Sequence, residues 1–413
     1  MKRFALDGAL VEELAGLIRW QDDRASDVRP AALDVREEEA AEVFARAAWT
    51  VLTEPGDRAA AEVLEALGAP AALELLVAGA TAGAVEAAMG EAGHPPAHPA
   101  ALTAALDRWR PRVSAATVRR AIESAHRRRV RLVVPSDTAW PGGLDDLGDG
   151  RPTALWVMGE LERLSWFGRS IAIVGARAAT GYGDHVASEF AAGLAAREWA
   201  IVSGGAYGID GSVHRAALAV DGATVAFLAG GLDRFYPSGH EELLSAVASR
   251  GLVISEVPCG VAPTRWRFLM RNRLMAAATL ATVIVEAGAR SGSLNTAHHA
   301  ADLGRPIGAV PGPITSPSSA GCHRILRELP SECVTSVAEV EALVEAVAFE
   351  QPEAAQESPD RVRVIDALSR KRPRDIDDIA RRTGMSHVEV TRVLGPLELE
   401  RRVAELDEGW VLC

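Results

Sequence analysis

Six short runs of apolar, largely β-branched residues recur between residues 171 and 310, and they constrain the fold more than any other feature. None shows the polar alternation of a half-exposed strand, and helical stretches separate them. Buried strands that alternate with helices predict an α/β protein with a parallel sheet covered on both faces, in a doubly wound, Rossmann-like arrangement. The expected strands are 171–174, 200–202, 224–228, 252–254, 282–285 and 306–310.

The segments on either side of the expected sheet have a different character. Residues 37–90 are rich in Ala, Leu and Glu, and Gly56, Gly68 and Gly79 divide them into short helices. Near the other end, three helical segments and a hairpin are typical of a winged-helix module. The expected organisation is an α-helical N-terminal domain (1–130, with a linker near 92–100), an extended Rossmann-like domain (131–349), a linker (350–360) and a C-terminal winged-helix domain (361–413).

The charge of the chain is unevenly distributed. The 413 residues carry a formal net charge of -12, which by itself argues against a nucleic-acid partner. By segment, however, the net charge is -7 for residues 1–164, +2 for 165–330 and -7 for 331–413. All cations except Lys2 and Lys371 are arginines, whose guanidinium fork suits phosphate geometry. The expected sheet is therefore the best candidate for binding anions.

Several functional classes lack the features they require. No uninterrupted apolar run reaches the roughly 18 residues that span a bilayer, and the first residues lack the apolar core of a signal peptide. We therefore expect a cytoplasmic protein without membrane contact. The four cysteines have no CxxC spacing, and the Walker, dinucleotide-binding, zinc-protease and α/β-hydrolase motifs are missing. We expect no metal and no cofactor.

Glycine- or serine-rich loops follow four of the expected strands, at residues 175–177, 203–208, 230–233 and 291–293. Glycine lets backbone N–H groups approach an anion, and the N-terminus of the following helix adds a favourable dipole. Because the carboxyl ends of parallel strands share one sheet edge, the four loops indicate an extended anion-binding surface there.

Residues 264–273 contain four arginines with an interleaved Trp and Phe. Arginines can contact phosphates, and aromatic rings can stack on bases. On composition alone, an amphipathic helix with buried aromatics and solvated arginines explains the run equally well. Its place after the strand 252–254 puts it on the same edge as the glycine-rich loops, which favours nucleic-acid binding.

Seven motifs occur in a fixed order along the sheet region: Ile173-Val174-Gly175-Ala176-Arg177, Ser203-Gly204-Gly205-Ala206-Tyr207-Gly208-Ile209-Asp210, Gly230-Gly231-Leu232-Asp233, Ile254-Ser255-Glu256, Arg271-Asn272-Arg273, Ser291-Gly292-Ser293-Leu294-Asn295-Thr296-Ala297 and Pro311-Gly312-Pro313. Their order and spacing over roughly residues 132–330 resemble the DprA/Smf family of DNA-processing proteins. The resemblance implies a non-enzymatic protein that binds and protects single-stranded DNA and helps load RecA recombinase during transformation or recombination. It also implies a homodimer.

The resemblance further assigns a DNA-binding set by motif and no catalytic residue. The set is Gly175, Arg177, Ser203, Gly204, Gly205, Ala206, Tyr207, Gly208, Arg265, Arg267, Arg271, Asn272, Arg273, Ser291, Gly292 and Ser293. Two departures from the family pattern matter. Gly56-Asp57-Arg58 is a poor version of the helix-hairpin-helix of many relatives, and residues 320–324 replace an Asn-rich motif.

Two alternative functions remain. A phosphoribohydrolase would use a similar sheet, but aligning residues 292–296 on the GTxxE motif of those enzymes puts Thr296 where a glutamate is needed, which disfavours hydrolysis. A transcription regulator that acts through the winged-helix module is the second alternative, but it would not explain the glycine-rich loops. In the expected winged-helix module, Arg392 has glutamates as its charged neighbours. The module could therefore bind DNA, contact another protein or have a purely structural role.

Overall fold

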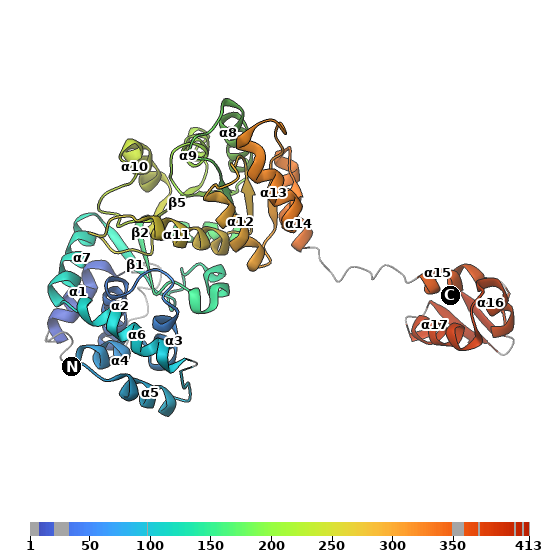
Figure 1. The fold of residues 1–413 in the computed structure, drawn as a ribbon, viewed down its shortest axis with the longest axis horizontal. Coiled ribbons are helices and arrows are strands. Elements are labelled where there is room, and N and C mark those ends of the chain that lie inside the picture. Colours follow the sequence, from blue (N-terminus) through green and yellow to red (C-terminus); the bar gives the residue numbers. More distant parts are fainter. Residues whose placement is uncertain are drawn as a thin grey trace. The chain divides into compact units, whose positions relative to one another are not determined.

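The computed structural model describes residues 8–19, 33–96, 98–348, 359–370, 372–399, 402–406 and 409–412. The chain divides into two compact units, Met1–Glu345 and Ala346–Cys413. The first contains a nine-stranded sheet with its helices, and the second contains a small helical module with a hairpin (Figure 1). Of the described helices, none is both long and apolar enough to cross a membrane.

The sheet has the strand order β1-β2-β6-β5-β4-β3-β7-β8-β9. Strands β3 to β9 are parallel, whereas β2 runs antiparallel to β6 and β1 runs antiparallel to β2. From β3 the chain adds β4, β5 and β6 on one side, and it then adds β7, β8 and β9 on the other side. This reversal places a topological switch point between β3 and β7. The strands are β1 (Val130–Val133), β2 (Leu155–Gly159), β3 (Ser170–Val174), β4 (Ala200–Ser203), β5 (Thr224–Leu228), β6 (Leu252–Ser255), β7 (Ala281–Ile284), β8 (Ile307–Ala309) and β9 (Glu332–Cys333).

All six expected strands are present as β3 to β8, and the doubly wound fold is confirmed. The antiparallel pair β1–β2 and the short β9 extend the sheet beyond its expected parallel part. Helices cover both faces, because successive side chains of a strand point to opposite sides. Ile171 and Ile173 of β3 enter one core, and Ala172 and Val174 enter the other.

Figure 1 shows α8, α9 and α10 on one side of the strands and α11 and α12 on the other. The helices of this part are α8 (Gly181–Ala195), α9 (Ile209–Ala219), α10 (Glu241–Arg250), α11 (Arg265–Ala278), α12 (Ser293–Asp302), α13 (Ala320–Glu328) and α14 (Val337–Ala348). Short 3-10 helices are η2 (Arg110–Arg112), η3 (Gly142–Gly150), η4 (Leu161–Arg169), η5 (Ser238–His240) and η6 (Pro317–Ser319).

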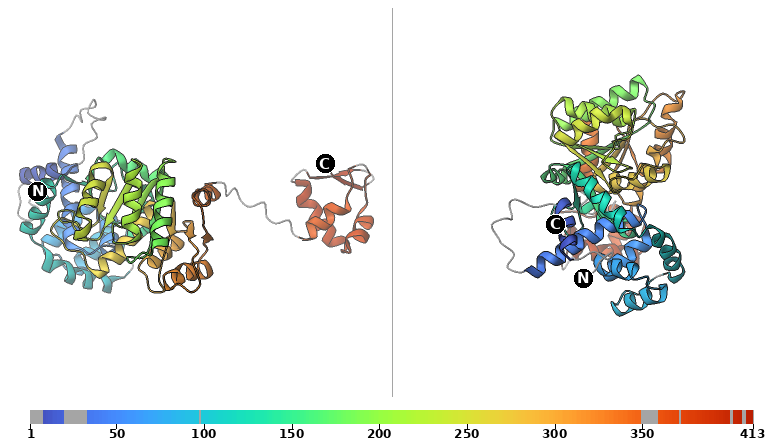
Figure 2. Two further views of the ribbon diagram at one scale, coloured as in Figure 1. Left: turned by 90° about the horizontal axis from the view of Figure 1, so that it is seen from above. Right: turned by 90° about the vertical axis from the view of Figure 1, so that its left-hand side faces the viewer.

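In the described part of the chain, seven helices precede the sheet and lie together as one group, of which α1 and α7 contact β1 (Figures 1 and 2). They are α1 (Gly8–Ile18), α2 (Leu33–Leu52), α3 (Arg58–Leu67), α4 (Ala69–Val77), α5 (Ala82–Glu91), α6 (Pro99–Trp109) and α7 (Ala115–Arg127). Gly56, Gly68 and Gly79 follow α2, α3 and α4 with φ angles of 71°, 76° and 74°, a region that favours glycine. These helices and the edge strands share one hydrophobic core. The separation of residues 1–130 and 131–349 into two domains stays a prediction.

The second compact unit has the helix order of a winged helix. It consists of α15 (Pro359–Ala367), α16 (Ile376–Thr383), α17 (His387–Leu399) and the antiparallel hairpin of β10 (Val403–Leu406) and β11 (Gly409–Leu412). Gly384 ends α16 in the left-handed conformation, with φ of 71°, and starts the tight turn before α17. Residues 350–358 of the expected linker lie outside the described residues, and residues 359 and 360 begin α15.

His214 of α9 is fully buried between α9 and β5, where its Nδ1 and Thr224 Oγ1 are hydrogen-bonded at 2.8 Å. Burial lowers the pKa of His214 to about 3. Because the unfolded chain takes up this proton near pH 6.5 and the folded chain does not, stability falls as the pH falls. Between pH 7.5 and 5.5 the loss from this group is about 1.4 kcal/mol.

We expect His214→Asn to show a correspondingly smaller loss of unfolding free energy between these two pH values, measured by chemical denaturation. His94→Asn, at an exposed histidine, is the control and keeps the full pH dependence. Equal pH dependence in the two variants would contradict the assignment to His214.

Candidate nucleic-acid interface

A cavity of about 850 Å³ lies at the carboxyl ends of β3 and β7, at the switch point of the sheet. The loop after β3, the loop before α12 and the first half of α11 contribute most of its lining. Nine of the sixteen residues of the expected DNA-binding set line it: Gly175, Arg177, Ala206, Arg265, Arg271, Asn272, Ser291, Gly292 and Ser293. Three segments far apart in the sequence therefore converge on one hollow.

The charge of this cavity is strongly positive, in contrast to that of the whole chain. Arg177, Arg265, Arg271 and Arg290 line it, and among the described residues Asp210 is the one acidic side chain in the lining. Arg177, Arg265 and Arg290 are exposed. The cavity thus presents cations to solvent with little competing negative charge.

A cluster of one arginine and two aromatic rings lines one wall of the cavity. The guanidinium carbon of Arg177 lies 4.8 Å from the centre of the Phe268 ring, within the range of a cation–π contact. The ring of Tyr236, which is 50% exposed, lies 5.7 Å from the same Phe268 ring. A charged group and two rings are therefore side by side, which is the combination that binds a phosphate and the base attached to it.

Arg271 is buried and acts first as a structural link. Its Nη1 donates to the carbonyls of Gly204 at 2.6 Å and Phe227 at 2.5 Å, and its Nε donates to Asn272 Oδ1 at 3.3 Å. Burial lowers the pKa of Arg271 to about 10, so the side chain stays charged at neutral pH. No described residue accepts a hydrogen bond from its Nη2.

Asp210, at the start of α9, holds the loop after β4 in place. Its Oδ2 accepts the backbone N–H groups of Gly204 at 3.2 Å and Ala206 at 3.4 Å. Burial raises the pKa of Asp210, and the charge of Arg271 opposes that rise. The carboxylate is thus engaged with the loop, and it is not a free acid or base in the cavity.

The loop 203–208 forms the support behind the cavity, and only its Ala206 reaches the lining. Ser203 Oγ donates to a β3 carbonyl at 2.7 Å, and the Gly205 carbonyl accepts from His240 Nδ1 at 3.0 Å. Tyr207 is 48% exposed and packs edge-on against His240. Five of the six loop residues in the expected set therefore lie outside the cavity.

Close packing of protein against protein explains two glycines of the loop 203–208. A side chain on Gly204 would overlap the Arg271 guanidinium, and one on Gly208 would overlap the carbonyl of Ala176. Gly208 also has φ of 75°. The expectation that glycines clear space for an anion is therefore too simple, because at these two positions the space is occupied by neighbouring residues.

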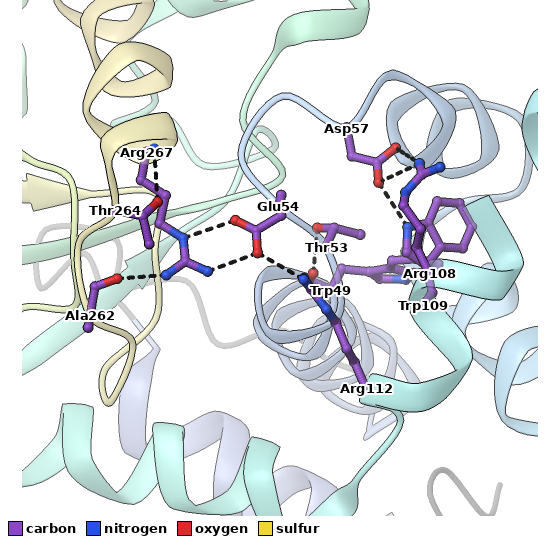
Figure 3. Close-up of polar contacts among 10 residues, drawn as sticks. All are labelled: Trp49, Thr53, Glu54, Asp57, Arg108, Trp109, Arg112, Ala262, Thr264 and Arg267. Carbon is purple, nitrogen blue, oxygen red and sulfur yellow. Dashed lines mark hydrogen bonds and ion pairs between the residues drawn. The ribbon is translucent and has the colours of Figure 1, made fainter. Parts of the chain in front are cut away.

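Arg267 and Arg273 of the expected set point away from the cavity, toward the N-terminal helices. Arg267 makes a two-pronged ion pair with Glu54 (Figure 3), with Nε–Oε2 and Nη2–Oε1 distances of 2.9 and 2.8 Å. Arg273 Nη2 donates to both oxygens of the buried Glu256 at 2.8 and 2.9 Å. Of the four arginines in residues 264–273, two therefore line the cavity and two form ion pairs with carboxylates away from it.

Several residues that line the cavity are missing from the expected set, among them Tyr236, Phe268, Arg290 and Asn295. The sequence offered a signal for each. Phe268 and Arg290 stand beside expected residues, and Tyr236 follows the glycine-rich loop at 230–233. Asn295 belongs to the motif that begins at Ser291, and it accepts a hydrogen bond at 3.2 Å from Asn272 Nδ2. Within the part of the chain that the structure describes, no three His, Cys, Asp or Glu side chains come together in a way that could hold a metal ion.

Comparison with known proteins decides the family. Residues 131–348, more than half of the chain, match the family model of DNA recombination-mediator protein A. The chain belongs to this DprA family. Residues 348–409 match the model of the DprA winged helix domain, in agreement with the second compact unit.

Individual DprA relatives agree with this assignment. The chain is 45% identical over 295 residues to a putative DNA processing protein DprA of Mycobacterium tuberculosis, covering 67% of this chain and 75% of the relative. It is 36% identical over 211 residues to the DNA processing protein DprA of Streptococcus pneumoniae, covering 50% and 73%. The X-ray structure of the pneumococcal protein superposes with a TM-score of 0.57 and 28% identity, over 73% of this chain and 97% of that one. DprA proteins process DNA and are not enzymes, which favours the DNA-processing interpretation over a phosphoribohydrolase.

Proposed function

We propose that the chain binds single-stranded DNA in the cavity at the β3–β7 switch point, protects it and helps load RecA recombinase onto it. The observation that carries the proposal is the cluster of Arg177, Phe268 and Tyr236 in a cavity lined by four arginines and one acidic residue. The exposed arginines supply phosphate contacts, and the rings supply faces for unpaired bases.

The same geometry favours single strands over duplex. A base in a duplex is stacked on its neighbours and paired, so its face is not available to Phe268 or Tyr236. Only phosphate contacts would remain for duplex DNA. The proposed contacts are arginine–phosphate contacts and ring stacking, neither of which reads base edges, so binding is independent of base sequence.

The test is fluorescence anisotropy of a labelled oligothymidylate and of a duplex of equal length, each at two salt concentrations. We expect tighter binding to the single strand and an affinity that falls as salt rises, with a slope near -0.7 per contacted phosphate. Arg177→Ala weakens binding to all sequences alike. Equal affinity for duplex, or binding that does not respond to salt, would exclude the proposal.

We further propose that the chain acts as a homodimer in the cytoplasm and that RecA is its protein partner. These statements rest on family membership. Sedimentation equilibrium tests the dimer, and a mass corresponding to one chain at micromolar concentration excludes it. Filament formation by RecA on single-stranded DNA, with and without the chain, tests the loading role, which is excluded if the rate is unchanged.

A further inference from the structure

Two faces of helix α11 make different contacts: one lines the cavity, and the other packs against the N-terminal helical part. Arg265, Phe268 and Asn272 line the cavity. On the other face, Arg267 binds Glu54, and Gly56 lies so close to α11 that a side chain there would overlap Met270. The turn 53–57, which joins α2 to α3, therefore packs directly against the helix that carries part of the proposed DNA site.

Glu54 is the centre of this contact (Figure 3). Its Oε2 accepts from Arg267 Nε, and its Oε1 accepts from both Arg267 Nη2 at 2.8 Å and Arg112 Nη2 at 2.9 Å. Burial acts to raise the pKa of Glu54, but the hydrogen bonds and charges of Arg267 and Arg112 outweigh it and lower the pKa. The carboxylate is therefore ionised near neutral pH and binds both guanidinium groups.

Each of the three guanidinium nitrogens of Arg267 donates a hydrogen bond to the protein. Its third nitrogen, Nη1, donates to the Ala262 carbonyl at 2.6 Å, and its side chain is only 16% exposed. Every nitrogen of this guanidinium has a protein acceptor. Arg267 is thus held by protein acceptors, whereas Arg265, two residues earlier, is exposed at the cavity.

The turn that presents Glu54 is itself held firmly. Asp57 caps α3 by accepting the N–H of Ala60, and it also accepts from Trp109 Nε1 at 2.9 Å and from Arg108. The Trp109 ring packs edge-on against Trp49, with 5.2 Å between ring centres. These contacts with α6 hold the turn in place. In Figure 3, Asp57 points toward Arg108 and Trp109, and Glu54 points toward Arg267 and Arg112.

We propose that Glu54 is a positioning residue of the single-stranded DNA site: it anchors the first turn of α11 through Arg267 and thereby sets the placement of Arg265 and Phe268. The helical N-terminal part contributes to DNA affinity without touching DNA. The proposal rests on the proposed function. The proposal predicts the sign of the change in DNA affinity when Glu54 is removed. Removal of a negative charge near the cavity would by itself strengthen DNA binding, whereas loss of the anchor weakens it.

The experiment is a double-mutant cycle with Glu54→Ala, Arg267→Ala and the double variant in the full chain, with anisotropy of labelled oligothymidylate over a range of salt concentrations. We expect each single variant to weaken binding by about five-fold, with the salt slope unchanged. The double variant should bind no worse than either single one, since both remove the same anchor. Hydrogen exchange should rise in the peptide that covers the first turn of α11.

Glu91→Ala removes an equal charge from an exposed position at the end of α5 and is the matched control. Tighter binding by Glu54→Ala, or a salt slope reduced by about 0.7 in Arg267→Ala, would overturn the proposal. The second result would identify Arg267 as a phosphate contact.

Two controls separate the possible failures. If the unaltered chain does not bind single-stranded DNA, the proposed function fails. If Arg177→Ala weakens binding and Glu54→Ala does not, only the positioning role fails. Should Glu54→Ala not fold, Glu54→Gln keeps the side-chain size while it removes the charge, and the same signs are expected.

Discussion

Replacement of Glu256 by alanine is expected to lower the free energy of unfolding by about 3–5 kcal/mol. Glu256 and Arg273 are 8% and 3% exposed, and their ion pair lies between β6 and α11. Burial raises the pKa of Glu256, and the charge of Arg273 opposes this rise. Without the carboxylate, a buried guanidinium would lose its counter-charge, and its Nε and Nη1 already have no partner among the described residues. Guanidinium chloride unfolding, followed by tryptophan fluorescence, measures the loss.

An exposed ion pair provides the matched control for this prediction. Glu328 pairs with Arg324 on α13, with both side chains about half exposed. Glu328→Ala should cost less than about 1 kcal/mol, because solvent screens such pairs. A double change of Glu256 to Leu and Arg273 to Met should recover much of the loss, since it removes both charges. Similar losses in Glu256→Ala and Glu328→Ala would contradict the prediction.

Replacement of Phe268 by alanine is expected to weaken single-stranded DNA binding by about 1–3 kcal/mol, the usual value of one base–aromatic stack. The salt dependence should be unchanged, because no charge is removed. Arg177→Ala should instead reduce the salt slope by about 0.7, which is the effect of one lost phosphate contact on a single strand. Anisotropy titrations over a range of salt concentrations measure both quantities.

The comparison of these two variants distinguishes stacking from charge in a pair of side chains that touch each other. Arg324→Ala is the control, because it removes an equal charge from an exposed pair on α13 that does not line the cavity. If Phe268→Ala binds single-stranded DNA as tightly as the unaltered chain, base stacking at this wall is excluded.

Much of the sheet could be predicted because its signal is local. Runs such as 171–174 and 252–254 are apolar and buried at every position, as a strand covered on both faces requires. The chain direction then places the carboxyl end of each parallel strand on the same edge. Arg177 and Ser291, more than a hundred residues apart, could therefore be predicted to meet, and both line the cavity.

The division of tasks within residues 264–273 could not be predicted. Arg265 and Arg267 are the same residue two positions apart, and both are compatible with a solvated or a DNA-binding role. What separates them is Glu54, which lies 213 residues from Arg267 in the chain. The same holds for Arg273, whose partner Glu256 follows β6. Neither acidic residue belongs to a motif that indicates its partner.

The sequence by itself determined the α/β architecture, the edge of the sheet that carries the loops, and the family, because these depend on apolar periodicity and on motif order. Tertiary structure alone decided which arginines stay exposed at the cavity and which are held by carboxylates. It also decided that Phe268 and Tyr236 stand beside Arg177. The physical reason is that an ion pair or a ring contact requires two groups within a few ångströms of each other. The fold brings such groups together from distant segments, and the spacing of those segments in the sequence does not predict the contact.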